Sequence, residues 1–242
     1  MIVASCQLLD IQNDVEASLS RIVEFGMEAE RVGADLVCYP ECFLQGYIVD
    51  EVKTREIAID LSSEAFASLL RRVSAIKPML VVGLVELSGE HLFNAAVVVK
   101  RGEVLGVYRK SRLLPREQLV FMPGDDFPVF KTNGMTFGIN ICYDLNFPEC
   151  ARAVADAGAS LIVCPCNNML RYQNAERWKE KHNPIRARRA VETNMWLLSS
   201  DVTGEREGRI SYGPTALIDP EGSVVLQVPL GQEGMIVREI GL

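Results

Sequence analysis

The sequence has little histidine and no long apolar segment, and both shortages exclude classes of protein. Only two histidines occur, His91 and His182. A zinc site would have to combine Cys164 and Cys166 with ligands that the sequence does not supply, so we expect no metal. No run approaches the roughly 20 apolar residues that span a bilayer. The N-terminus has no basic stretch ahead of its apolar residues, so we expect an unexported, cytoplasmic protein with no membrane partner.

Excess positive charge is also missing. The formal net charge is −7, and the acidic residues are spread among the basic ones rather than gathered in a tail. This distribution gives no electrostatic reason to bind nucleic acid, so we expect no such partner. No internal repeat, low-complexity tract or linker divides the chain. For 242 residues, of which 48% are hydrophobic, we expect one domain over residues 1–242.

The cysteines do not form a pattern typical of a disulfide framework. Their number is odd, and most lie inside apolar, strand-like segments. The seven positions are Cys6, Cys38, Cys42, Cys142, Cys150, Cys164 and Cys166. Free thiols of this kind are typical of a reducing compartment.

Apolar runs of strand length alternate with segments of helical period, and this order predicts a layered α/β fold. Expected helices follow Asn13 up to Gly33, cover 63–77 and 148–158, and run from Ala175 to Asn194 with an irregularity around Pro184. Expected strands cover 1–9, 34–41, 79–87, 92–100, 103–110, 135–144, 160–166, 196–203, 214–220, 223–229 and 234–240. Arg101 and Gly102 predict a tight hairpin turn between two of these strands.

Cys142 lies where a predicted strand gives way to a helix that Pro148 opens. A nucleophile at such an elbow projects above the sheet, where backbone N–H groups after the turn can stabilise a thiolate or an oxyanion. A buried structural cysteine is an equally good interpretation of this segment alone.

Glu41 and Lys110 also follow apolar strands. A buried carboxylate beside a cysteine and a lysine could have a pKa high enough to accept the thiol proton. An ammonium there could pair with the carboxylate and stabilise a tetrahedral intermediate. Taken singly, each is more simply a solvated charge at a strand end, as Arg109 illustrates. Their common position at strand ends, where α/β folds place their sites, favours one shared site with Cys142.

Three strings extend this pattern into a family resemblance: YPE at 39–41, YRK at 108–110 and CYDLNFPE at 142–149. They resemble the signatures of the nitrilase superfamily, the carbon–nitrogen hydrolases, and the similarity covers nearly the whole chain. The resemblance implies an α-β-β-α sandwich that usually forms a homodimer. It also implies that Glu41 is the general base, Lys110 the electrostatic support and Cys142 the nucleophile.

The resemblance assigns two supporting residues as well. Glu117, in EQLVFMPGD, matches a second active-site glutamate that positions substrate, and the backbone N–H of Tyr143 matches an oxyanion-hole donor. The chain departs from many members in a shorter loop between Lys110 and Glu117, which alters pocket size. It also has Asn146 where many members carry arginine, which affects local packing.

We therefore expect a cofactor-free hydrolase that cleaves the C–N bond of a small amide-type substrate through a thioester on Cys142. An omega-amidase-like, carbamoyl-amine or related amide substrate fits this chemistry, with release of ammonia or an amine. Nitrile hydrolysis and acyl transfer to an amine are alternatives on the same scaffold. A non-catalytic interaction protein is the alternative from another class, and the presence of all three signature residues argues against it.

Other residues offer weaker hypotheses. A papain-like cysteine–histidine pair would need His91, which follows a turn, or His182, which lies in a charged stretch that is typical of a solvated helix face. Asn167 could bind a substrate amide or carboxylate, although a loop-capping role is equally consistent with its position. Arg186, Arg188 and Arg189 could attract a carboxylated substrate or a partner subunit, but nearby glutamates favour a salt-bridged helix.

Overall fold

The computed structural model describes residues 1–241, and its strands form one continuous 14-stranded sheet with two main halves, called here the first and the second sheet. The first sheet contains β1 (Ile2–Leu9), β2 (Leu36–Cys38), β3 (Met79–Ser88), β4 (His91–Lys100), β5 (Glu103–Arg109) and β14 (Gly234–Glu239). The second contains β6 (Val129–Thr132), β7 (Met135–Ile139), β8 (Leu161–Pro165), β10 (Trp196–Arg206), β12 (Ala216–Ile218) and β13 (Val224–Gln227). The two are joined where the ends of β1 and β10 pair in parallel.

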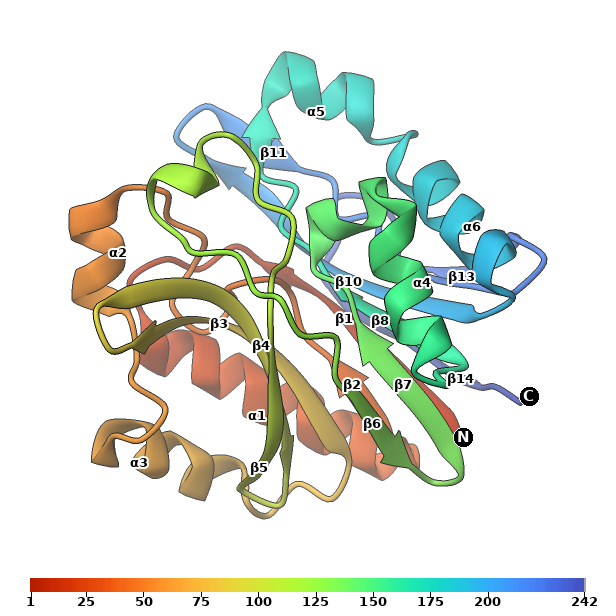
Figure 1. The fold of residues 1–242 in the computed structure, drawn as a ribbon, viewed down its shortest axis with the longest axis horizontal. Coiled ribbons are helices and arrows are strands. Elements are labelled where there is room, and N and C mark those ends of the chain that lie inside the picture. The colour runs from red at the N-terminus through yellow and green to blue at the C-terminus, as the bar shows by residue number, and fades with distance from the viewer. Residues whose placement is uncertain (242) are drawn as a thin grey trace.

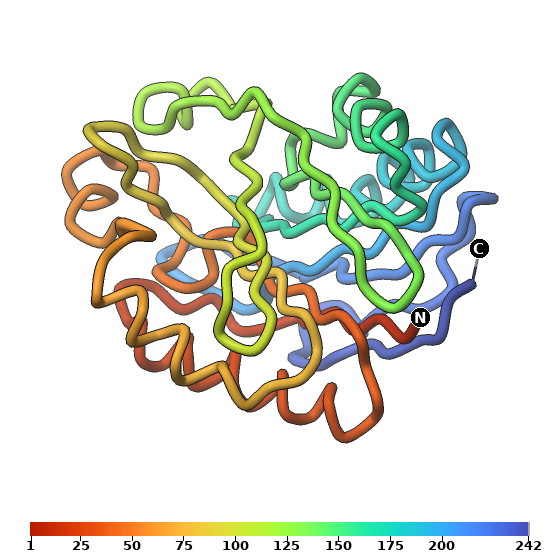
Figure 2. Tube along the Cα trace, turned by 60° about the horizontal axis from the view of Figure 1, so that its bottom comes forward, coloured from red at the N-terminus to blue at the C-terminus, as the bar shows by residue number. Residues whose placement is uncertain are grey.

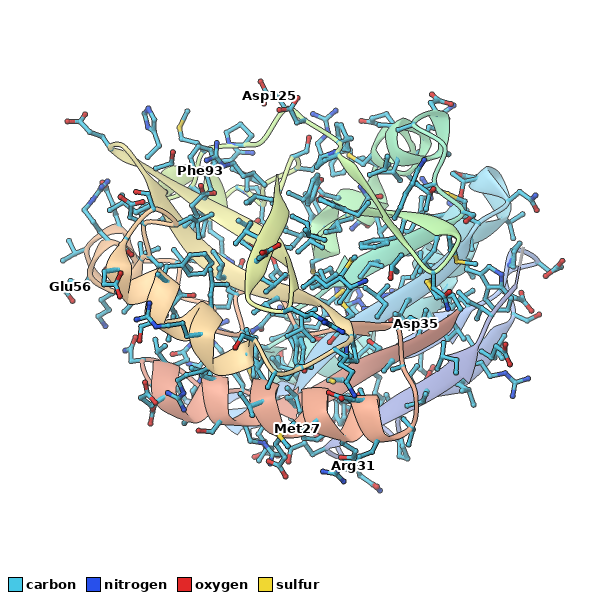
Figure 3. The ribbon with its side chains drawn as sticks, turned by 90° about the horizontal axis from the view of Figure 1, so that it is seen from below. Met27, Arg31, Asp35, Glu56, Phe93 and Asp125 are labelled. Atoms are coloured by element: carbon cyan, nitrogen blue, oxygen red, sulfur yellow. The ribbon has the colours of Figure 1, made fainter. Side chains whose placement is uncertain are left out.

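The helices lie around the two sheets. They are α1 (Val15–Arg31), α2 (Glu51–Ile57), α3 (Glu64–Val73), α4 (Pro148–Asp156), α5 (Tyr172–Trp178) and α6 (His182–Thr193). Helices α1 and α3 pack on the outer face of the first sheet and α4 and α6 on that of the second, whereas α5 lies at the upper end of the molecule in Figure 1. Figure 3 shows α1 beneath the strands, with Met27 and Arg31 pointing away from them, and Figure 1 shows α4 and α6 over the second sheet. No helix within residues 1–241 has the length and apolar character to cross a bilayer.

Apolar side chains fill three layers between these elements. Along β3, Leu80 packs against α1 and α3, whereas Val81 on the opposite face packs against the second sheet. This alternation is the period of two that a strand imposes on its side chains. A third cluster joins α4 and α6 to the outer face of the second sheet. The expected α/β class and the α-β-β-α sandwich are therefore confirmed.

Local signals explain where several elements begin and turn. Asp14 caps α1 by accepting a hydrogen bond from the Ala17 N–H at 2.9 Å. Arg101 and Gly102 both have positive φ, at 51° and 79°, as the tight turn between antiparallel strands requires. The start of β1 and the end of β14 lie on one side of the molecule in Figures 1 and 2, because β14 pairs antiparallel with β1.

The prediction of one helix from Ala175 to Asn194 is wrong. The structure has α5 and α6 with a break over 179–181. Proline has no N–H to donate, and its ring collides with the carbonyl four residues earlier in a continuous helix. Pro184 fits only within the first turn of α6, so the chain has to break before it. Helix α2 and the short strands β6, β9 (Leu170–Arg171) and β11 (Arg209–Ser211) were not predicted from sequence.

Candidate active site

Strand direction brings the expected site residues to one edge of the sandwich. Strands β2 and β3 are parallel, and so are β7, β8 and β10. Strand β5 is antiparallel to β4, which is antiparallel to β3, so β5 ends at the same edge as β3. Carboxyl ends of parallel strands are where α/β folds gather side chains. Glu41, Lys110, Cys142 and Asn167 follow these ends, and all four line one pocket of about 260 Å³.

A buried ammonium lies between two buried carboxylates at this edge. The Lys110 Nζ is 2.7 Å from Glu41 Oε1 and 2.8 Å from Glu117 Oε1. All three side chains are at most 1% exposed. Removing one member of such a set would leave an uncompensated buried charge, so the three residues depend on one another.

The Glu41 carboxylate is fixed by donors on both of its oxygens. Asn94 Nδ2 donates to Oε1 at 2.7 Å, and the Asn167 backbone N–H donates to Oε2 at 2.9 Å. The Glu41 N–H in turn donates to the Cys166 carbonyl at 3.1 Å. The base candidate is therefore held at its backbone and at its carboxylate.

Gly83 on β3 allows this part of the chain to approach the sheet. A Cβ at position 83 would lie 2.2 Å from the Pro40 carbonyl oxygen and 2.8 Å from the Glu41 Cα. Real Cβ atoms do not approach backbone so closely, so only glycine fits here. The absence of a side chain at position 83 thus sets the position of Glu41.

Both carboxylate oxygens of Glu117 accept hydrogen bonds from the chain around the site. Its Oε1 accepts from the Tyr47 hydroxyl at 2.8 Å, and its Oε2 accepts from the Leu114 N–H at 2.7 Å. Glu117 begins a 3-10 helix (Glu117–Leu119) in the loop that follows β5. The residue expected to support the site from sequence therefore contacts the Lys110 ammonium directly.

Burial and charge set the protonation of the cluster. Burial raises the pKa of Glu41 above its usual value, against the opposing effect of Lys110. Burial alone would lower the pKa of Lys110, but Glu41 and Glu117 raise it well above its usual value. Lys110 consequently stays an ammonium, while Glu41 becomes a stronger base than a solvated glutamate.

Cys142 lies at a strained turn. Strand β7 ends at Ile139, and Cys142 opens a 3-10 helix (Cys142–Asn146) with a φ of 45°. Non-glycine residues with positive φ are uncommon and cluster at functional sites. The next backbone N–H, of Tyr143, has no hydrogen-bond acceptor among the described residues. The turn expected between β7 and the following helix is therefore present, and the backbone N–H that follows Cys142 is left without an acceptor within residues 1–241.

The Cys142 thiol has a second thiol as its neighbour. Cys166 lines the same pocket, and its influence, followed by burial and Glu41, raises the pKa of Cys142 well above its usual value. Arg186 Nη2 lies 3.1 Å from the Cys166 sulfur. The resting nucleophile candidate is therefore a thiol, and its activation needs a base.

The Asp144 carboxylate accepts hydrogen bonds that hold the turn at Cys142 in position. Its Oδ2 accepts from the Tyr108 hydroxyl at 2.7 Å and from the Ile141 N–H at 2.8 Å, and its Oδ1 accepts from the Arg112 N–H at 2.7 Å. Tyr108 and Arg112 lie on either side of Lys110 in sequence. Asp144 therefore connects the segment that carries Lys110 to the segment that carries Cys142.

Asp144→Asn is expected to lower the free energy of unfolding by about 2–3 kcal/mol, because the amide NH₂ would face a backbone N–H donor. The measurement is urea unfolding at pH 8, since burial raises the pKa of Asp144 to about 6 and the side chain is ionised there. Asp125→Asn, at the exposed residue that Figure 3 labels, is the matched control. Equal stability of the two variants would contradict the role of Asp144.

Two predictions about the segment 175–194 need correction. His182 is not on a solvated face: it is half-buried in the pocket wall, and burial together with Arg186 lowers its pKa to about 3. A neutral imidazole with so low a pKa is a poor base, which argues against a papain-like pair. Arg186 is buried and lies 3.5 Å from Asp201 rather than pairing with a glutamate. Arg188 is exposed, and Arg189 does pair with Glu192.

The Asn167 side chain makes loop contacts within the pocket wall. Its Nδ2 lies 3.3 Å from Asp10 Oδ1, and its Oδ1 accepts from the Met169 N–H at 3.2 Å. Its backbone, by contrast, contacts Glu41. Residues 1–241 contain no group of three or more cysteine, histidine or acidic side chains placed to hold a metal ion.

Sequence reasoning missed four residues of this site: Tyr47, Asn94, Asp144 and Cys166. A signal existed for Asn94, since it is the one polar residue within the apolar run LFNAAVVV. A buried amide in such a run requires a partner. The presence of Cys166 in the same pocket as Cys142 depends on how β7 and β8 pair, which sequence spacing does not reveal.

The α-β-β-α sandwich and the pocket that contains Glu41, Lys110 and Cys142 point to a carbon–nitrogen hydrolase, and sequence comparison agrees. The model of the family described as carbon-nitrogen hydrolase matches residues 2–242, so the chain belongs to that family. The family membership expected from the three signatures is thereby confirmed.

Individual relatives place the chain within the nitrilase superfamily. It is 34% identical over 221 residues to a nitrilase of Pyrococcus abyssi, covering 89% of this chain and 80% of that protein. It is 29% identical over 193 residues to an (R)-stereoselective amidase of Pseudomonas sp, covering 80% and 68%. A solved mutant of the amidase from Nesterenkonia sp. AN1, showing Michael addition of acrylamide at its active site cysteine, has a TM-score of 0.88 at 26% identity, covering 100% and 93%.

Proposed function

We propose that the protein hydrolyses the C–N bond of a small amide-type substrate through a thioester on Cys142. The observation that carries the proposal is the buried Glu41–Lys110 pair in the same pocket as a cysteine with positive φ. A base with a raised pKa, a permanent cation and a nucleophile at an elbow are the groups that acyl transfer needs. No other group is required for the bond changes.

The reaction proceeds in two halves. Glu41 accepts the Cys142 thiol proton as the sulfur bonds to the carbonyl carbon, and then passes that proton to the departing nitrogen, so that ammonia or an amine leaves and a thioester forms. Glu41 next takes a proton from water as the water oxygen attacks the thioester. The C–S bond breaks, the acid leaves, and the sulfur recovers a proton.

The negative oxygen of each tetrahedral intermediate needs donors. We assign these to the Lys110 ammonium and the Tyr143 N–H, which lacks an acceptor among the described residues. Preorganised donors of this kind act on the charge that develops in the transition state. Glu117 holds Lys110 and lies beside the pocket, which supports a role in placing the ammonium and the substrate.

Nitrile hydrolysis is a second candidate, favoured by the 34% identity to a protein named a nitrilase. It uses the same attack of Cys142 on an electrophilic carbon. Transfer of the acyl group to an amine instead of water uses the same thioester. A homodimer, expected from the resemblance, and a cytoplasmic location, expected from the N-terminal sequence, stay predictions for sedimentation and cell fractionation to test.

The test of the proposal is ammonia or amine release from a panel of amides, ureido acids and nitriles. We expect turnover of at least one amide series, with an acyl adduct on the Cys142 peptide in quenched samples seen by mass spectrometry. Addition of amines to the assay identifies acyl transfer by its product. A panel that yields neither released nitrogen nor an adduct contradicts the enzymatic proposal.

The pH profile of kcat/KM is expected to fall on the acid side with an apparent pKa above 4.5, the usual value for glutamate. Glu41 must be ionised to accept the thiol proton, and its burial raises its pKa, so activity is lost as the pH falls through that raised value. The apparent pKa belongs to the interacting cluster as a whole. Circular dichroism over the same range controls for unfolding, and a flat profile down to pH 4 with intact fold would exclude Glu41 as the base.

A further inference from the structure

A second hollow lies outside the active-site pocket and continues it toward solvent. Its volume is about 440 Å³, and its walls come from the loop before Glu117 and from β9, α5 and β11. Leu114, Arg116 and Leu170 line both spaces, whereas Cys142 lines only the inner one. Figure 1 shows α5 and β11 close together at the upper end of the sheets. A substrate with its amide at Cys142 would extend its far end into this outer hollow.

Three arginines and no acidic residue line the outer hollow. They are Arg116, Arg171 and Arg209. Within residues 1–241, none of these guanidiniums has a carboxylate within the 4.0 Å of an ion pair. Arg206, on the neighbouring strand β10, is by contrast paired with Asp10 at 2.7 Å. In a chain of net charge −7, three unpaired cations around one opening require an explanation.

Strand pairing places two of these arginines, Arg171 and Arg209, next to each other. Strands β9 and β11 are antiparallel, and Arg171 and Arg209 are directly opposite residues in their register. Like charges in that arrangement destabilise a strand pair. An anion bound between them would remove the repulsion, because a planar guanidinium binds a carboxylate with two parallel hydrogen bonds.

Arg116 lines both the outer hollow and the active-site pocket. Its guanidinium lies 5.4 Å from the centre of the Tyr47 ring, and the Tyr47 hydroxyl donates to Glu117 at 2.8 Å. Charges deeper in the pocket are already matched, since Lys110 faces two carboxylates and Arg186 faces Asp201. Among the described residues, the outer hollow is therefore the part of the site where positive charge is unpaired and available to bind a ligand.

We propose that Arg116, Arg171 and Arg209 bind a carboxylate at the end of the substrate remote from the scissile bond, so that preferred substrates are monoamides of dicarboxylic acids. This inference rests on the proposed function and specifies its substrate class. The three arginines determine specificity and take no part in bond making. Positive charge around the opening also raises the local concentration of anionic substrate.

The first experiment compares two series of primary amides of matched chain length, one ending in carboxylate and one in methyl. We expect the wild type to favour the carboxylate series by about 10- to 100-fold in kcat/KM. In the variant R116Q/R171Q/R209Q this ratio falls toward one, with the loss carried by KM rather than kcat. R188Q, at an exposed arginine of α6 outside both spaces, is the matched control and keeps the ratio.

The second experiment does not depend on amide hydrolysis. Two N-substituted iodoacetamides, one ending in carboxylate and one in methyl, alkylate Cys142, and peptide mass spectrometry follows the rates. We expect the anionic reagent to react several-fold faster with the wild type, and its advantage to shrink in the triple variant and in 0.5 M salt. If no amide is turned over but this difference is present, the proposed function fails while the anion site stands. Equal rate ratios in wild type and triple variant would overturn the anion site.

Discussion

Cys142→Ala is expected to lower kcat for amide hydrolysis by on the order of 10⁴-fold or more, because the variant cannot form the thioester. The fold should survive, since Cys142 is half-buried and alanine also fits the space of the thiol. Its positive φ is a backbone strain that the substitution leaves unchanged. The measurements are ammonia release at saturating amide and the mass of the protein after rapid quenching.

The control for this loss is a thiol outside the pocket. Cys38 on β2 lies in the core between the two sheets, and Cys38→Ala removes a sulfur there without touching the pocket. We expect this variant to keep its acyl adduct and to retain activity within a few-fold, with a modest loss of stability. Activity in Cys142→Ala above about one per cent of wild type would exclude the thioester route.

Lys110→Met is expected both to abolish hydrolysis and to lower the free energy of unfolding by about 3–5 kcal/mol. Methionine has a similar length but leaves Glu41 and Glu117 buried with no cation between them. Their repulsion eases when Glu41, whose pKa burial raises, takes up a proton, so the loss of stability should be larger at pH 8 than at pH 6. Chemical denaturation at the two pH values gives the stability, and ammonia release gives the activity.

A second substitution separates the two effects of Lys110. Adding Glu117→Gln removes one of the uncompensated carboxylates, so Lys110→Met/Glu117→Gln should recover part of the stability while hydrolysis stays absent. Lys77→Met removes an exposed ion pair with Glu30 and is the matched control, with an expected change below about 1 kcal/mol. Recovery of activity together with stability in the double variant would show that Lys110 is only structural.

The site could be predicted to a large extent because its residues follow strands. Glu41, Lys110 and Cys142 each end an apolar run, and the order of these runs predicts strands whose carboxyl ends share an edge. The sandwich itself followed from the resemblance rather than from spacing. The structure places all three residues at that edge, in one pocket.

The parts that sequence did not predict depend on distant contacts. Tyr47 reaches Glu117 across 70 positions of sequence, and no local pattern encodes such a pair. The stretch around His182 has the charge pattern of a surface helix, but the break that Pro184 imposes turns His182 and Arg186 toward the pocket. A cross-strand pair such as Arg171 and Arg209 needs the register of two very short strands, which periodicity cannot give.

The close packing at Gly83 bears on how this enzyme could acquire new substrates. The Gly83 backbone lies against the backbone of residues 40–42 there, so the position of Glu41, the proposed base, is set by the main chain rather than by a choice of side-chain rotamer. Variation that enlarges or recharges the pocket is free to accumulate in the outer loops, at Arg116 or around β9 and β11, without disturbing the chemistry. A laboratory selection for a different amide should therefore collect its changes at the opening and leave position 83 untouched.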